Sequence, residues 1–231
     1  MTEQSTSQDV DITGKSIAVL GGTGDQGRGL ARRFALAGHT VHLGSRSAER
    51  AAKAANDLVE AESTEIRVHG LENAEAAAMG DIVVVAVPWD GHRELLVSLA
   101  DRLAGKIVVD CVNPLGFDKK GPYALDVPEG SAAQQAAEFL PGSRVTAAFH
   151  HVSAVLLLDP EVAEIELDIL VLGEDREATD VVRALAGTIP GARGVFGGRL
   201  RNAHQVEALT ANLIAVNRRY KTHAGIRVTG L

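Results

Sequence analysis

The chain has 231 residues, 45% of them hydrophobic, which is enough for one large domain or for one domain with a smaller appendage. A formal net charge of -7 argues against non-specific nucleic-acid binding, and no apolar run reaches the roughly 18 residues of a membrane span. A single cysteine, Cys111, excludes an internal disulfide, and the polar first residues lack the apolar core of a signal peptide, so we expect a cytoplasmic protein with neither a nucleic-acid nor a membrane partner.

Apolar segments alternate with helical patterns from residue 16 to residue 112. The predicted elements are, in chain order, the strand 16–21, the helix 26–38, the strand 40–45, the helix 48–62, the strands 65–70 and 81–88, the helix 91–103 and the strand 106–112. The run 81–88 is apolar throughout, as in a strand buried on both faces. This alternation predicts an α/β fold of the Rossmann type, with a doubly wound parallel sheet and right-handed crossovers.

The pattern changes after residue 112. Residues 113–131 are rich in proline and glycine and predict a loop. The later predicted elements are the helix 132–140, the strands 144–152 and 168–173, the helix 176–189, the short strand 194–198 and a long helix 202–219. We therefore expect three parts: a flexible tail at 1–14, a dinucleotide-binding Rossmann domain at 15–152 and a small C-terminal α/β lobe at 153–231.

A glycine motif follows the first predicted strand. Gly22, Gly24 and Gly27 match G-x-G-x-x-G, with a strand before them and a helix after them. In this motif the first glycine makes the tight turn, the second admits a pyrophosphate to the backbone, and the third lets helix and strand pack closely. The pyrophosphate then lies on the helix N-terminus, where free N–H groups favour anions.

The end of the second predicted strand indicates which nucleotide binds. An NAD enzyme carries an acid about 20 residues after the glycines, but no acid lies between Asp25 and Glu49. Ser45 and Arg46 occupy that place, and Arg50 follows one helical turn later. A hydroxyl and a planar guanidinium suit a 2′-phosphate, so we expect NADP(H) rather than NAD(H). The alternative is that the two arginines are solvated residues at a helix start.

The strand end at 87–91 is expected to face the glycine loop, because ligands of open α/β sheets lie at the carboxyl ends of the strands. Val87 and Pro88 are then placed to pack on the ribose or the nicotinamide. Trp89 either lines the crevice or fills the edge of the domain. Asn113, after the next strand, either contacts the nicotinamide ribose or is a turn residue before a proline.

The sequence lacks the motifs of a proton-transfer dyad or a metal site. Neither tyrosine has a lysine four residues on, and no H-E-x-x-H or C-x-x-C occurs. His150 and His151 are neighbours on a predicted strand and should point to opposite faces, so they do not easily share a metal. His150 either borders the site or is a hydrogen-bonded structural residue, and His92, at a helix start, is expected at the surface. Hydride transfer between two cofactors fits this pattern, because it needs stacking and orientation above all.

Four stretches together resemble the F420-dependent NADP reductases: "GGTGDQGRGLARRFALAGHTVHLGSR", "VPW" after a buried strand, "HH" after "TAAF", and "LTANLIAVNRR" near the end. The resemblance implies direct hydride transfer between NADP(H) and the 8-hydroxy-5-deazaflavin coenzyme F420, without a metal or a covalent intermediate. It also implies site residues. It places Thr23, Gly24, Asp25 and Gln26 at the pyrophosphate, Ser45, Arg46 and Arg50 at the 2′-phosphate, Val87 and Trp89 along the nicotinamide half, and the segment 150–154 at the junction of the two rings. Together with the residues argued above, the expected cofactor residues are Gly22, Thr23, Gly24, Asp25, Gln26, Gly27, Ser45, Arg46, Arg50, Val87, Trp89, Asn113 and Ala154. The expected substrate residues are His150 and Val152.

The C-terminal part adds two expectations. Six lysines or arginines and one acid lie between Arg199 and Leu231, so a basic rim could help to capture an anionic coenzyme; the alternative is that these charges face solvent. The final helix carries an apolar stripe that either forms a homodimer or packs within one subunit. Two other functions stay open: an NADPH-dependent reductase of an imine or a flavin, and a non-catalytic NADP(H) sensor.

Overall fold

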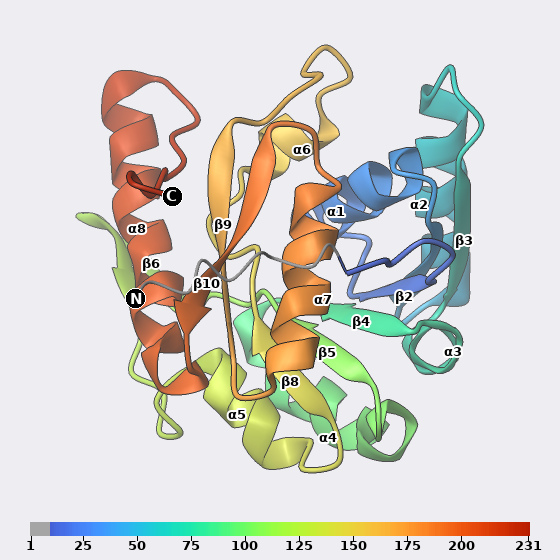
Figure 1. The fold of residues 1–231 in the computed structure, drawn as a ribbon, viewed down its shortest axis with the longest axis horizontal. Coiled ribbons are helices and arrows are strands. Elements are labelled where there is room, and N and C mark those ends of the chain that lie inside the picture. The colour runs from blue at the N-terminus through green and yellow to red at the C-terminus, as the bar shows by residue number, and fades with distance from the viewer. Residues whose placement is uncertain (1–9) are drawn as a thin grey trace, which may run out of the picture.

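A computed structural model describes residues 10–231 and shows a central sheet covered by helices on both faces (Figure 1). Residues 1–9 of the expected tail lie outside the described residues. The elements are β1 (Ile17–Leu20), α1 (Asp25–Leu36), β2 (Thr40–Ser45), α2 (Ala48–Ala61), β3 (Arg67–Glu72), α3 (Asn73–Met79), β4 (Ile82–Val85), η1 (Trp89–Gly91), α4 (His92–Leu103), β5 (Ile107–Asp110), β6 (Leu115–Asp118), β7 (Gly121–Ala124), α5 (Ala132–Phe139), β8 (Arg144–Ala147), α6 (Ala154–Leu158), β9 (Leu167–Gly173), α7 (Arg176–Gly187), β10 (Ala192–Gly198), η2 (Leu200–Asn202) and α8 (Ala203–Tyr220).

The main sheet has eight strands in the order β10-β9-β8-β5-β4-β1-β2-β3. Neighbouring strands run parallel except for β8 and β9, which pair antiparallel. Strands β1, β4 and β5 are buried along their whole length, which explains why they are apolar up to the buried Asp110 that ends β5. The expected Rossmann-type sheet is confirmed, and its strand order reverses between β1 and β4, where such sheets bind ligands.

Two hydrophobic layers hold the helices on the sheet. One layer packs α1, α2, α6 and α7 on one face, and the other packs α3, α4, α5 and α8 on the opposite face. The alternation of side chains along each strand produces this division: Ile17 and Val19 enter the first layer, whereas Ala18 and Leu20 enter the second. Ile12 is buried in the first layer, so this residue of the expected tail belongs to the core.

The segment after residue 153 extends this same sheet. Strand β9 pairs with β8 at Thr146 and Ala147, and β10 pairs with β9, with α7 connecting them. At the start of β9, the buried Asp168 accepts hydrogen bonds from Arg193 at 2.7 Å and from the backbone N–H of Val228 at 2.7 Å. The residues of the expected C-terminal lobe are therefore joined to the Rossmann strands by backbone pairing.

Several segments differ from the sequence-based expectations, among them the helices α3 and α6, which were not predicted. The region 113–131 contains the antiparallel hairpin β6–β7, which packs beside α8 and turns at Lys119–Lys120, a pair without the glycine that marks most two-residue hairpin turns. The predicted strand 144–152 ends at Ala147, because Phe149 has a φ of 65°, which is incompatible with an extended strand.

Candidate functional site

A long cleft of about 940 Å³ opens at the carboxyl ends of β1, β2 and β4. Because the strand order reverses here, this is the place where the fold favours a ligand. The expected cofactor residues that line it are Thr23, Gly24, Asp25, Gln26, Ser45, Arg46, Arg50 and Val87. Residues from three segments of the sequence, the glycine loop, the end of β2 with the start of α2, and the end of β4, therefore border one cleft.

The glycine loop makes its sharp turn at Gly21, one residue before the expected position. Gly21 has a φ of 68°, and a Cβ there would lie 2.3 Å from the side chain of Val87. Gly22 packs against the chain instead, since its Cβ would lie 2.7 Å from the carbonyl oxygen of Val19. The side chain of Asn73, which the sequence analysis missed, accepts a hydrogen bond from the Gly21 N–H at 3.1 Å and so fixes the loop.

Gly27 packs closely, as expected, whereas Gly24 leaves open space. A Cβ on Gly27 would lie 2.6 Å from the Cα of Gly22, so this glycine lets α1 approach the loop. A Cβ on Gly24 would meet nothing closer than a backbone oxygen at 4.0 Å and would occupy space beside the cleft. Gly24 is also the N-cap of α1 and has no side-chain cap, so the first N–H groups of the helix are available to an anion. A pyrophosphate group fits this cradle.

Ser45, Arg46 and Arg50 come together at the end of β2. Ser45 is buried, whereas both arginines are exposed along the cleft. The Ser47 hydroxyl caps α2 by accepting the Arg50 N–H at 3.3 Å, so the N-terminus of a second helix begins at the same place. Within residues 10–231, neither arginine forms an ion pair. This group has the charge and the donors that a phosphate requires.

One acid also borders the cleft, and the sequence analysis did not consider it. Glu72 ends β3 and pairs in register with Ser45 of β2. A search for an acid along the sequence stops at the end of the second strand, whereas the sheet brings the end of the third strand beside it. Any test of nucleotide preference therefore has to include Glu72.

A second cavity of about 340 Å³ adjoins the cleft. The two spaces share Gln26, Ala86 and Val87 on their linings. The further walls come from the residues after β5, from the turn before α6, and from α8. Expected site residues that line this cavity are Asn113, His150, Val152 and Ala154. The side-chain amide of Asn113 is used within the protein, because its Nδ2 donates to the carbonyl of His150 at 2.8 Å.

Trp89 lines neither space. It is partly buried in η1, packs against the core layer that contains α4, and lies with its ring centroid 5.4 Å from that of His92. Of the two roles considered for it, filling the edge of the fold is the one that its contacts match. Its neighbours Pro88 and Asp90 line the cleft.

His150 and His151 lie in a turn and both line the second cavity. The argument that they point to opposite faces of a strand is therefore wrong, because the strand has ended before them. Burial lowers the pKa of both side chains to about 4, so both imidazoles are neutral at pH 7. Within the described residues, no ring nitrogen of either histidine has a hydrogen-bond partner, so of the two roles considered for His150, bordering the site is the one that its contacts match.

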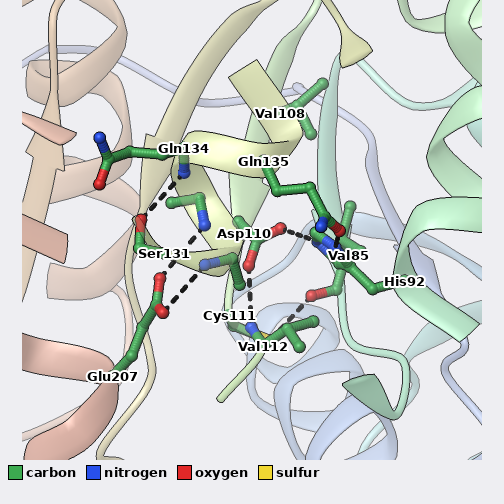
Figure 2. A network of polar contacts seen from close by, with 12 residues as sticks. Val85, His92, Val108, Asp110, Cys111, Val112, Ser131, Gln134, Gln135 and Glu207 are labelled. Atoms are coloured by element: carbon green, nitrogen blue, oxygen red, sulfur yellow. Dashed lines mark hydrogen bonds and ion pairs between the residues drawn. The ribbon is translucent and has the colours of Figure 1, made fainter. Parts of the chain in front are cut away.

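His92 is fully buried, contrary to the expected surface position (Figure 2). Its Nδ1 lies 2.9 Å from Oε1 of Gln135, and its Nε2 lies 2.5 Å from the carboxylate of Asp110. Burial lowers the pKa of His92, but the Asp110 carboxylate outweighs this effect and raises it. Asp110 also accepts the N–H of Val112 at 3.0 Å, and Val112 lines the second cavity. The network therefore joins the start of α4 to this cavity wall.

Glu207 of α8 is a second buried acid near this network (Figure 2). It accepts the backbone N–H groups of Ala132 and Ala133 at 3.0 and 3.2 Å, at the start of α5. Burial raises the pKa of Glu207 to about 7, and the charge of Asp110 adds to the increase, while the two N–H groups oppose it. Glu207 thus fixes α8, which lines the second cavity, to the helix beside it.

The described part of the chain contains no group of three or more histidine, cysteine, aspartate or glutamate side chains arranged to hold a metal ion. No helix within residues 10–231 combines the length and the apolar character needed to cross a bilayer.

Comparison with known proteins points to one family. Residues 16–114 match the family described as NADP oxidoreductase, coenzyme F420-dependent. The chain is 45% identical over 222 residues to the F420-dependent NADP reductase of Methanothermobacter thermautotrophicus, a match that covers 93% of this chain and 95% of the relative. It is 40% identical to the enzyme of the same name from Methanocaldococcus jannaschii, covering 93% of this chain and 98% of that one.

Solved structures give the same indication. The crystal structure of a putative F420-dependent NADP reductase from Arthrobacter sp. FB24 superposes with a TM-score of 0.79 at 28% identity, covering 94% of this chain and all of that one. An imine reductase from Streptomyces aurantiacus superposes with a TM-score of 0.59 at 22% identity, covering 89% of this chain and 62% of that one, which shows a shared fold only.

Proposed function

This chain belongs to the family of F420-dependent NADP reductases, and we propose that it transfers a hydride directly between NADP(H) and the deazaflavin coenzyme F420. The observation that carries this proposal is the pair of adjoining spaces, one long cleft and one smaller cavity, which share Gln26, Ala86 and Val87. Two ring systems bound in these spaces would meet at the shared wall, and direct hydride transfer requires such contact.

The cleft suits NADP(H). We assign the pyrophosphate to the loop from Gly22 to Gly27, where Gly24 leaves room at the uncapped start of α1. We assign the 2′-phosphate to Ser45, Arg46 and Arg50, which border the cleft at the end of β2. Val87 belongs to both spaces, so it is the residue best placed to support the nicotinamide.

The second cavity suits the deazaflavin. Its volume of about 340 Å³ is in the range of small-molecule sites, and most of its walls are apolar. His150 and Val152 would contact the deazaflavin, and Ala154 would lie beside the nicotinamide. When bound, reduced nicotinamide supplies the hydride, and solvent supplies the proton that completes the reduced deazaflavin. The protein's own part is to orient the two rings and to keep water from the space between them.

Turnover of the purified protein tests this function. We expect NADPH oxidation only when F420 is present, with one deazaflavin reduced per NADPH consumed. FMN and FAD serve as matched acceptors, and turnover with either one would favour the alternative of a flavin reductase. A cyclic imine as acceptor tests the imine reductase in the same assay. Tight NADPH binding without any turnover would favour the sensor.

We also propose that the protein is a cytoplasmic homodimer. Much of the apolar stripe of α8 is used within the subunit, since Val206 is in the core and Leu213 and Ile214 line the second cavity. The large apolar side chains that remain exposed nearby are Val216 and Tyr220 on α8 and Phe117 and Tyr123 on the hairpin beside it. This exposed face is the surface that we assign to the dimer contact.

A basic rim beside the second cavity is a further part of the proposal. Of the six basic residues near the C-terminus, Arg199 pairs with Glu174 and Arg227 pairs with Asp168. Arg218, Arg219 and Lys221 follow directly after Asn217, which lines the cavity, and no ion pair engages them within residues 10–231. These three charges would attract the anionic tail of the coenzyme.

A further inference from the structure

Phe149 has a backbone conformation that bulky residues rarely adopt. Its φ of 65° lies in the left-handed region, and its side chain is fully buried. Within residues 10–231, the other non-glycine residue with positive φ is Lys221, which ends α8, where left-handed residues are common. Backbone strain of this kind persists only when the surrounding structure imposes it.

Several contacts impose it here. The ring of Phe149 packs edge-to-face against Phe34 of α1, with centroids 5.7 Å apart. The carbonyl of Phe149 accepts the side-chain N–H of Gln26 at 3.2 Å. The next carbonyl, that of His150, accepts two side-chain donors, Nδ2 of Asn113 at 2.8 Å and Oγ1 of Thr210 at 3.0 Å. Donors from α1, from the end of β5 and from α8 thus meet on two consecutive peptide groups.

The contact of Thr210 is unusual for a helical threonine. Such hydroxyls commonly bond to a carbonyl three or four residues earlier in their own helix, as Thr179 does with Arg176 in α7. Thr210 reaches a residue 60 positions away in the sequence instead. Thr210 itself and its neighbours on α8, Leu213, Ile214 and Asn217, line the second cavity, so this bond also joins that wall to the histidine turn.

We propose that Thr210 is a positioning residue for hydride transfer, which acts by holding the carbonyl of His150 so that both imidazoles line the cavity next to the shared wall. This inference rests on the proposed function, because it assigns a role within that same site. Thr210 does not border the nucleotide cleft. Its loss therefore affects the step between the two bound rings and leaves the capture of NADPH unchanged.

Replacing the hydroxyl by a methyl group tests this role. Thr210→Val keeps the shape of the side chain and removes the donor, and Thr210→Ser keeps the donor. Thr179→Val is the matched control, since Thr179 is a buried helical threonine whose hydroxyl bonds to a carbonyl away from both spaces. We expect Thr210→Val to lower kcat about tenfold with an unchanged KM for NADPH, because small misplacements of reacting groups are costly. Thr210→Ser should restore most of kcat.

The isotope effect separates positioning from stability. With NADPH deuterated at the transferred hydrogen, the effect on kcat should increase in Thr210→Val, because hydride transfer becomes slower than product release. The melting temperature should decrease by the same amount in Thr210→Val and Thr179→Val. Equal loss of kcat in these two variants, or no recovery in Thr210→Ser, would overturn the proposal.

A second measurement does not depend on activity. The chain has 8 histidines, and NMR of protein labelled at the imidazole carbons can follow His150 and His151, assigned with His150→Gln and His151→Gln variants. Both signals should shift in Thr210→Val and stay in place in Thr179→Val and Thr210→Ser. Unmoved signals in Thr210→Val contradict the positioning role. If the wild type does not reduce F420, the proposed function fails, while these signals still decide whether Thr210 holds the turn.

Discussion

Single side chains at the end of β2 determine what the cleft can hold. Arg46 and Arg50 present cations beside the buried hydroxyl of Ser45, and the N-terminus of α2 begins at the same point. Glu72 is the acid on the neighbouring strand end, and a carboxylate there would favour a free ribose hydroxyl over a phosphate. Nucleotide preference is thus a balance between two arginines and one glutamate.

The first prediction concerns Arg46. Arg46→Ala should decrease kcat/KM for NADPH about tenfold and leave that for NADH nearly unchanged, because the guanidinium is needed only by the extra phosphate. Steady-state kinetics with both nucleotides measures this. Arg102→Ala, an exposed arginine of α4 outside both spaces, is the control. Glu72→Gln should have the opposite effect and raise kcat/KM for NADPH relative to that for NADH. Equal losses with both nucleotides in Arg46→Ala would refute the assignment.

Glu207 makes the stability of the fold depend on pH. The pKa of Glu207 is raised to about 7 by burial first, so the folded chain keeps a proton that the unfolded chain releases near pH 4.5. Glu207 does not change the free energy of unfolding below pH 4.5, because it is protonated in both states. Between pH 4.5 and pH 7 it lowers the free energy of unfolding progressively, by on the order of 3 kcal/mol. The raised pKa of His92 acts in the same direction, since its favourable contribution is lost as the pH rises above its usual range.

The second prediction follows from this sign. Denaturant titrations of the wild type and Glu207→Gln between pH 5 and pH 8 should show the wild type losing stability relative to the variant as the pH rises. Glutamine keeps one acceptor for the N–H groups of Ala132 and Ala133 and cannot ionise. Glu138→Gln, at an exposed acid of α5, is the control and should leave the difference from the wild type constant with pH. If the free energies of unfolding of the wild type and Glu207→Gln change in parallel with pH, the raised pKa of Glu207 is contradicted.

Elements rather than single residues build the second cavity. Helix α8 contributes one wall, carries the exposed arginines at its C-terminal end, and is anchored at its start by Glu207 against α5. The hairpin β6–β7 packs beside α8, and a Cβ on Gly121 would lie 3.9 Å from the guanidinium of Arg218. One wall of the cavity and the basic rim therefore belong to the same helix.

The third prediction concerns this rim. With NADPH saturating, the KM for F420 should increase with ionic strength, because salt screens the attraction between exposed charges. The double variant Arg218→Ala/Arg219→Ala should raise that KM several-fold at low salt and flatten its dependence on salt. The control is Arg102→Ala/Arg201→Ala, which removes two exposed arginines away from the cavity. An unchanged KM for F420 in Arg218→Ala/Arg219→Ala would show that the basic rim does not contribute to coenzyme binding.

The sequence predicted the elements that depend on local patterns. The buried strands, the glycine loop and the long final helix follow from apolar periods and from glycine spacing, and the structure confirms them. His92 was misplaced because its partners, Asp110 and Gln135, lie 18 and 43 residues away. The turn at Phe149 could not be predicted, since side chains from three distant segments impose a conformation that phenylalanine disfavours. Residues that act through the tertiary structure leave no local signal.

The whole molecule is organised around one sheet. Strands β9 and β10 continue the Rossmann strands, so the residues that bring α8 to the second cavity are fixed to the same sheet as the glycine loop. Both spaces thus have walls on a common scaffold. The β8–β9 pairing at Thr146 and Ala147 is the backbone link between the two groups of strands.

The fourth prediction concerns assembly. The chain has a mass of 24.2 kDa, and sedimentation equilibrium should give twice this value at micromolar concentration. Phe117→Ser combined with Tyr220→Asp should give the single-chain mass, because burying a charge in an apolar contact is unfavourable. Met79→Ser, at an exposed apolar residue of α3, is the control and should leave the dimer intact. A wild type that sediments as a single chain would end the proposal of a dimer.

The position of Trp89 gives the protein a built-in optical probe. It is the one tryptophan of the chain, and the residues on either side of it, Pro88 and Asp90, line the nucleotide cleft. Indole emission overlaps the absorption of reduced nicotinamide, so energy transfer would quench the fluorescence of Trp89 when NADPH binds. Oxidation of the bound nucleotide would restore the fluorescence. Occupancy and redox state of the cleft can therefore be followed in the unlabelled, unmodified protein.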